Sequence, residues 1–347
     1  MPRPDIFLFC ELGPMALAEL FDQPGLLDEL ATQQYSVALG IIDFSPQRAA
    51  IVRSLNARGI SVVAWLLLPP EEGYWFNLGN YPQAAARYEA FKQWAEQELL
   101  QFAAIGLDIE PMINDRSAVQ QGDTLHMFSR AAQAQRNALY PAARDAYHDL
   151  AAVIRHDGYE VHTYQYPLII DDRRAGTTLV QRSLDIVDVP ADHEVLLLYS
   201  SHIKLLLGTD LGGAFVRSYG EHGDGIAVGV TGGGYLDPIS GSPSPRVSLE
   251  VFLRDLRIAA HYTDTVHIFS LEGCVERGWL SKLADMDWDT PVALSRLYRA
   301  EAHLVRMLLS FVLWCSRAGW TAIGWLGWVV AGGLLLERRV SRWRRRR

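Results

Sequence analysis

Cysteine is scarce in this chain, which has three among 347 residues. Cys10, Cys274 and Cys315 lack the paired spacing of a zinc site, and three are too few for a disulfide-held fold. The ten histidines form no His-x-His or His-Glu-x-x-His pair, and no Gly-x-x-x-x-Gly-Lys loop is present. The sequence therefore predicts neither a metal nor an organic cofactor.

Positive charge is sparse except at the carboxyl end. The last ten residues contain seven arginines, and removing them from the net charge of −8 leaves −15 on residues 1–337. An acidic body is a poor nucleic-acid binder, because neutralising phosphates needs a basic surface. No nucleic-acid partner is expected for the body.

Short β-branched and apolar runs alternate with longer helical patterns, which is typical of βα units around a parallel sheet. The runs are 6–11, 36–43, 60–68, 104–110, 160–168, 194–200, 225–231 and 265–271. Eight such runs predict a (β/α)8 TIM barrel of the α/β class over residues 1–289. An additional short run at 185–189 keeps an open doubly wound sheet as the alternative.

Helical patterns separate these runs. They cover 15–32, 46–58, 82–102, 126–157, 174–184, 205–219 and 247–261. Pro46 and Pro82 lie where a first helical turn accepts proline, because that turn needs no donor from the missing N–H.

The pattern changes after the eighth run. Residues 290–303 predict an amphipathic connecting helix, and 304–316 are mostly apolar apart from Arg306. Nineteen residues without charge follow at 318–336, long enough to cross about 30 Å of hydrocarbon. We therefore expect a membrane-anchoring segment at 304–337, a single span or a hairpin, with an Arg-rich tail at 338–347 and lipid contacts through 304–347.

Two positions of the barrel relative to the membrane are compatible with the sequence. Arginine-rich ends stay cytoplasmic, so the tail is predicted to be inside. A single span would then place the acidic body outside, although no translocation signal is visible for it. A hairpin turning near residues 317–319 would leave both ends in the cytoplasm, and an interfacial first half at 304–316 is equally compatible with the pattern.

The strongest local feature ends the fourth run, Gly106-Leu107-Asp108-Ile109-Glu110-Pro111. Strand side chains alternate between faces, so Asp108 and Glu110 share one side and would point into the barrel or its mouth. Two neighbouring carboxylates raise the proton affinity of one of them, which suits acid–base catalysis. The competing interpretation is a structural pair that caps the next loop or bridges to Arg116.

Further polar and aromatic residues fall near predicted strand ends, where active sites of such barrels gather. Glu11 and Glu272 would complete a ring of carboxylates. Flat aromatic surfaces suit sugar faces, and the candidates for substrate contact are Trp65, Tyr74, Trp75, Tyr164, Tyr166 and Tyr199. Packing of the loop at 73–77 on the barrel rim is the alternative role for Tyr74 and Trp75.

This strand end resembles the Asp-x-Glu strand end of barrel glycoside hydrolases, notably the family 25 lysozymes and more loosely the family 18 chitinases. The resemblance implies that Glu110 is the general acid and that Asp108 orients the substrate or stabilises developing charge. The chain departs from both patterns. Glu11 stands where the lysozyme-like pattern has Asp, and Met112 stands where the chitinase-like pattern has Glu.

Three functional hypotheses follow. The first is a membrane-attached glycoside hydrolase acting on a polysaccharide or a lipid-linked saccharide. The second is a catalytically inactive barrel that binds a glycan or another protein at the membrane. The third is an enzyme for phosphorylated metabolites that uses the glycine-rich loop at 229–234 to bind phosphate.

Overall fold

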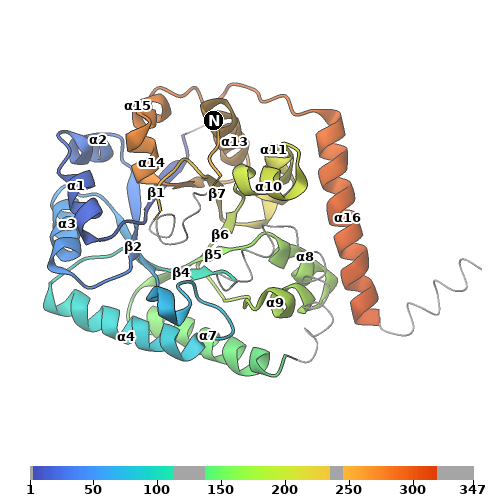
Figure 1. The fold of residues 1–347 in the computed structure, drawn as a ribbon, viewed down its shortest axis with the longest axis horizontal. Coiled ribbons are helices and arrows are strands. Elements are labelled where there is room, and N and C mark those ends of the chain that lie inside the picture. Colours follow the sequence, from blue (N-terminus) through green and yellow to red (C-terminus); the bar gives the residue numbers. More distant parts are fainter. Residues whose placement is uncertain (1–2, 112–136, 235–244, 319–347) are drawn as a thin grey trace, which may run out of the picture.

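Eight parallel strands form the core of the computed structural model, which describes residues 3–111, 137–234 and 245–318. The strands pair in sequence order, and β8 pairs with β1, so the sheet closes into a barrel (Figure 1). This closure confirms the predicted TIM barrel and excludes the open sheet. The strands are β1 (Asp5–Cys10), β2 (Ser36–Ile41), β3 (Val62–Leu66), β4 (Ala104–Ile109), β5 (Glu160–Gln165), β6 (His193–Leu197), β7 (Gly225–Gly229) and β8 (Thr265–Phe269).

Helices surround the barrel. They are α1 (Pro14–Phe21), α2 (Leu26–Thr32), α3 (Pro46–Ala57), α4 (Tyr81–Gln97), α7 (Leu139–His156), α8 (Leu168–Ala175), α9 (Leu179–Leu184), α10 (Ser200–Leu207), α11 (Gly212–Tyr219), α13 (Leu249–Ala260), α14 (Leu271–Glu276), α15 (Trp279–Ala284) and α16 (Arg296–Ala318). Two short 3-10 turns are η1 (Pro70–Glu72) and η2 (Gly220–His222). Pro46 occupies the first turn of α3 as expected, behind Ser45, whose hydroxyl accepts from the Arg48 amide.

Some predicted helices are divided. The pattern at 15–32 forms α1 and α2, because Gly25 takes a left-handed conformation at φ 82°. The pattern at 174–184 is mostly α9, and the preceding α8 begins earlier than predicted, directly after Pro167. Gly176, at φ 63°, ends α8. Part of the pattern at 126–157 lies outside the described residues.

Aromatic rings fill the barrel interior, where branched aliphatic side chains are usual. The Phe9 ring lies 4.7 Å from that of Tyr164 and 5.0 Å from that of Trp65. Gly106 makes room for them, since a Cβ there would lie 2.7 Å from the Tyr164 ring. Residues on the other face of the same strands, such as Leu107 and Ile109, pack in the core between the barrel and its helices.

The carboxyl-terminal helix α16 runs through residue 303, so it crosses the predicted boundary between a connecting helix and a membrane segment. It packs along the outside of the barrel against α8 and α11 (Figure 1). Among the described residues, no helix is both long enough and apolar enough to cross a membrane. Most of the uncharged stretch at 318–336 and the whole Arg-rich tail lie outside the described residues.

Candidate functional site

The carboxyl end of β4 places Asp108 inside the barrel. Its side chain is buried, and the indole Nε1 of Trp65 on β3 donates to Asp108 Oδ2 at 3.1 Å. The rings of Trp65 and Tyr164 lie on the same inner face of the barrel. Asp108 therefore lies next to the aromatic side chains of the interior, at the carboxyl end of the barrel. It points inward, as strand alternation predicted. A carboxylate held this way is fixed in direction by a rigid donor.

Glu110 directly follows β4, and it is also buried. The Tyr166 hydroxyl, beyond the end of β5, donates to Glu110 Oε2 at 3.3 Å. The backbone at Glu110 is held as well, because its N–H donates to the Phe76 carbonyl at 3.2 Å, and the Phe76 N–H donates to the Asp108 carbonyl at 2.9 Å. The loop after β3 thus pairs with β4 in parallel and extends the sheet at the acid pair. The Arg116 alternative lies outside the described residues.

The same loop reaches the end of β1. The Tyr74 hydroxyl donates to Glu11 Oε1 at 2.6 Å, and both side chains are buried. Gly73 and Tyr74 have φ values of 103° and 63°, a left-handed turn that only glycine adopts without strain. Residues Tyr74–Phe76 therefore connect Glu11 on one side of the mouth to Asp108 and Glu110 on the other.

Glu272 is not at the end of β8, as the strand pattern predicted, but in the first turn of α14. The amides of Glu11 and Gly234 donate to its Oε1 at 3.4 and 3.1 Å. Burial raises its pKa to about 7, although these amides and Ser270 act in the opposite direction. Glu272 touches the Glu11 backbone and so lies beside the site, where it holds two loops together.

The glycine-rich loop at 229–234 is occupied by that same carboxyl group. Gly232, Gly233 and Gly234 all have positive φ, and a Cβ on Gly233 would lie 2.1 Å from Glu272 Cγ. Because the Gly234 amide already donates to Glu272, it is not free for a phosphate. The loop therefore binds the Glu272 carboxyl group, which weighs against the hypothesis that it binds phosphate.

The aromatic candidates are more buried than an open sugar platform requires. Tyr74 is 0% and Trp75 is 5% exposed, and their rings meet edge to face at 5.3 Å. Trp65 and Tyr164 are filling residues of the barrel interior. Of the six aromatic candidates, Tyr166 and Tyr199 are partly exposed. Tyr199 lies 6.0 Å from the Phe269 ring, at the start of α10.

Two further polar residues near strand ends serve the fold. Asp43 accepts from the buried Arg48 at 2.7 Å and from the Ser45 amide. These contacts lower its pKa, despite the opposing effect of burial. Gln165 faces away from the barrel interior, where its amide donates to Thr163. A strand shows which residues share a face, but its end point decides which of them reach the mouth.

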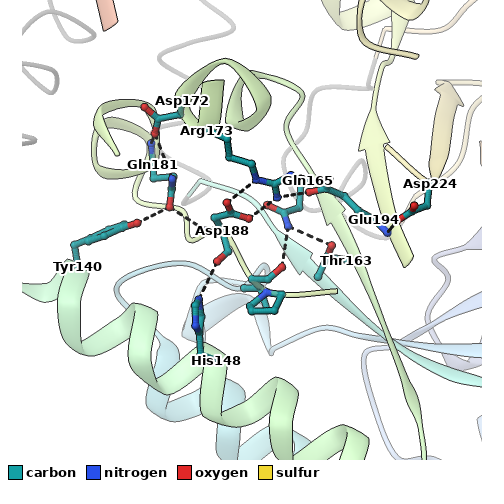
Figure 2. A network of polar contacts seen from close by, with 12 residues as sticks. Tyr140, His148, Thr163, Gln165, Asp172, Arg173, Gln181, Asp188, Glu194 and Asp224 are labelled. Carbon is teal, nitrogen blue, oxygen red and sulfur yellow. Dashed lines mark hydrogen bonds and ion pairs between the residues drawn. The ribbon is translucent and has the colours of Figure 1, made fainter. Parts of the chain in front are cut away.

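Figure 2 shows a polar network outside the barrel wall, which includes Gln165. Arg173 on α8 bonds to both Asp188 and Glu194, and the Glu194 amide donates to Asp224 at 2.8 Å. These partners raise the pKa of Arg173 further above its usual value, although burial opposes them. A cavity of about 330 Å³ borders the network. Asp188, Glu194 and Asp224 lie near the amino ends of β6 and β7, away from the mouth.

Sequence reasoning missed a histidine cluster at the amino end of the barrel interior. His162 and His193 lie 4.8 Å apart, His193 and His267 lie 5.8 Å apart, and Phe7 stacks on His267 at 4.6 Å. Burial lowers the pKa of all three imidazoles. Their inward positions on β5, β6 and β8 were available from strand alternation. No group of metal-binding side chains was found in the part of the chain that the structure describes.

No family model matches this chain, and no curated protein matches it. The family 25 and family 18 resemblance therefore rests on the residues at the end of β4 alone. Among solved structures, a family 2 AP endonuclease from Brucella melitensis gives a TM-score of 0.42 at 13% identity, covering 80% of this chain and 98% of its own.

Two other solved structures are similar at the same level. A xylose isomerase domain protein from Planctomyces limnophilus gives a TM-score of 0.43 at 13% identity, covering 81% of this chain and 97% of its own. The pneumococcal virulence factor StrH gives 0.44 at 11% identity, covering 89% and 97%. Scores this low add nothing to what the eight paired strands establish.

Proposed function

We propose that this barrel is a membrane-attached glycoside hydrolase-like enzyme acting on a polysaccharide or a lipid-linked saccharide. The observation that carries the proposal is the set of three carboxyl groups at the carboxyl end of the barrel. Glu11, Asp108 and Glu110 each accept from the indole or hydroxyl of an aromatic side chain. Glycosidic bonds are cleaved by pairs of carboxyl groups in a fixed relative position.

Glu110 is the proposed general acid, and it would give its proton to the leaving glycosidic oxygen. Asp108 would stabilise the positive charge that develops at the sugar ring, because its Oδ2 is held by Trp65 and its orientation is fixed before the substrate arrives. Glu11, held by Tyr74, would be the third carboxyl group around the sugar. Tyr166 and Tyr199, which are partly exposed, remain the aromatic candidates for sugar contact.

Membrane attachment is the second part of the proposal. It rests on the uncharged residues 318–336 and on the seven arginines that follow them. With the Arg-rich tail in the cytoplasm, a cytoplasmic barrel would meet lipid-linked saccharides, and an external barrel would meet wall or capsule polymers. Attachment would confine the enzyme to the surface that carries its substrate.

The test is replacement of Glu110 by Gln, which keeps the shape of the side chain and removes the acid. The full-length protein in detergent is assayed with aryl glycosides and with bacterial wall polysaccharide, each followed by release of reducing ends. We expect turnover to fall about a hundredfold or more in the variant, as for loss of a general acid. Glu89→Gln, on the exposed face of α4, is the control. Equal turnover by wild type and Glu110→Gln would rule out the assignment.

The burial of Tyr74 and Trp75 favours the inactive binding module as the second candidate. A mouth whose aromatic side chains are packed away has less surface for a substrate. This alternative predicts glycan binding that survives the joint change of Asp108→Asn and Glu110→Gln, with no product from the wild type. Binding measured by calorimetry on the same polysaccharide fragments, beside the turnover assay, separates the two candidates.

A further inference from the structure

The outer face of α16 is apolar and exposed. From Leu304 to Trp314, the residues that point away from the barrel recur three and four positions apart, as on one side of a helix. These exposed side chains are Leu304, Val305, Met307, Leu308, Phe311, Val312 and Trp314, and we call them the outer face of α16. Phe311 and Trp314 stack on each other at 6.3 Å. Isolated exposed apolar residues are ordinary, but a contiguous helical stripe marks a contact surface.

The opposite side of α16 is fixed to the barrel. Ala302, Arg306 and Leu313 are buried there. Arg306 donates to Asp171 of α8 at 2.9 Å, and its guanidinium lies 3.9 Å from the centre of the Tyr219 ring of α11. Arg317, one helical turn beyond Leu313, donates to the Ala175 carbonyl at 3.2 Å. The only charged residue between 304 and 314 therefore faces inward, and the outer face has no charge.

The chain beyond α16 indicates what covers this face. Twenty-nine residues follow Ala318, and they contain four tryptophans, an uncharged stretch and seven arginines in the last ten positions. Tryptophan is enriched where a protein meets the headgroup region, and arginine clusters are attracted to anionic lipids. An apolar helix face that leads directly into such a segment matches a lipid surface better than a soluble partner.

We infer that α16 is an interfacial membrane helix, whose outer face enters the headgroup region of an anionic bilayer while its inner face holds the barrel. This inference rests on the membrane attachment proposed above, and not on the glycosidase chemistry. The barrel would then have one fixed orientation on the membrane, because Arg306 and Arg317 join α16 to α8. Its substrate would have to reach the mouth along or near the membrane surface.

A local fluorescent probe tests this in the full-length protein. Cys10 and Cys274 are buried, so Cys315→Ser removes the cysteine that is partly exposed. Phe311→Cys is then labelled with NBD, a probe whose emission shifts to the blue in apolar surroundings. Met15→Cys on α1, on the opposite side of the barrel, is the matched control (Figure 1). Vesicles contain either phosphatidylcholine alone or equal parts phosphatidylcholine and phosphatidylglycerol.

The expected result is a blue shift and loss of iodide quenching at position 311 with the anionic vesicles, and neither change at position 15. A protein that floats with the vesicles while position 311 stays quenched would overturn the inference, since attachment would then use other residues. Protection at position 311 without lipid, increasing with protein concentration, would also overturn it and point to a second copy. Absence of vesicle binding would overturn both the inference and the attachment, and would leave the Glu110→Gln test unaffected.

Discussion

The Tyr74 hydroxyl lies 2.6 Å from Glu11 Oε1, although the two residues are 63 positions apart. This bond joins the loop after β3 to the end of β1. Because Phe76 in the same loop pairs with β4, one short segment positions all three inward carboxyl groups. The three residues Tyr74–Phe76, which we call the strap, therefore organise the mouth together with the barrel strands.

Replacing Tyr74 with Phe tests this strap. The ring stays, but Glu11 loses a donor in a buried environment. We expect a loss of about 1–3 kcal/mol in the free energy of unfolding, the usual effect of removing a hydrogen bond to a buried ionisable group. Urea denaturation followed by circular dichroism measures it. Tyr262→Phe is the control, because its hydroxyl makes no hydrogen bond to the described residues. Equal losses in both variants would mean that the Tyr74–Glu11 bond does not stabilise the fold.

Strand alternation was enough to predict the barrel and the inward orientation of Asp108. The runs at 104–110 and 225–231 begin at the same residues as β4 and β7, because short apolar segments between helical patterns have few other interpretations. Glu272 shows the limit of this reasoning. The predicted strand ended two residues too late, which placed Glu272 at the end of β8 instead of in the first turn of α14. Only Ser270 separates β8 from α14.

The strap and the buried ion pairs could not be predicted. The conformation of Tyr74 depends on a left-handed turn, and aromatic residues rarely adopt it. Residues 169–173 lay between the predicted strand at 160–168 and the predicted helix at 174–184, yet Asp171 and Asp172 are buried in α8. Their partners explain this: Arg306 is 135 positions from Asp171, and Asp172 accepts from the amides of Leu179 and Gln181 in α9. Local patterns contain no information about such distant partners.

Gly106 tests the packing of the aromatic interior. An alanine Cβ would lie 2.7 Å from Tyr164 Cε2, so the ring would have to move within a filled barrel. We expect Gly106→Ala to lower the free energy of unfolding by about 1–3 kcal/mol through overpacking. Tyr164→Leu removes the clashing end of the ring and provides the control. In a double-mutant cycle, Gly106→Ala should cost less in the Tyr164→Leu background. Strict additivity would contradict this account.

The lowered pKa of His162 predicts that the folded protein loses stability in acid. Burial lowers its pKa from 6.5 to about 4, and the nearby His193 acts in the same direction. The unfolded chain therefore binds a proton at a higher pH than the folded chain does. The contribution of neutral His162 to the free energy of unfolding is fully present above pH 6.5. It decreases by about 3 kcal/mol as the pH falls toward 4. Urea denaturation of His162→Leu between pH 7 and pH 4 should show a weaker dependence than wild type. Exposed His156→Leu should behave as wild type.

The raised pKa of Glu272 predicts the opposite dependence, a loss of stability as the pH rises. Its folded pKa of about 7 exceeds the ordinary 4.5, so the folded chain retains the proton after the unfolded chain has released it. Stability from this group is present below pH 4.5 and is lost as the pH rises to 7, by about 3 kcal/mol. Glu272→Gln cannot ionise. Its free energy of unfolding relative to wild type should therefore increase from pH 4.5 to pH 7. The same difference at every pH would show that folding leaves the pKa of this carboxyl unchanged.

The buried pair of Arg306 and Asp171 predicts how α16 is held. Arg306→Met removes the cation that pairs with Asp171 and leaves the Tyr219 hydroxyl as a donor, in a position that is 1% exposed. Removing one member of a buried ion pair costs about 3–5 kcal/mol, because the other charge is left uncompensated. Hydrogen exchange of the amides of α16 should rise sharply, since the helix would detach while the barrel stays folded. Arg299→Met, on the exposed part of the same helix, should leave exchange unchanged. Adding Asp171→Asn to Arg306→Met removes the unpaired charge and should restore part of the protection. If Arg306→Met exchanges like wild type, α16 is held by its apolar contacts and the ion pair is dispensable.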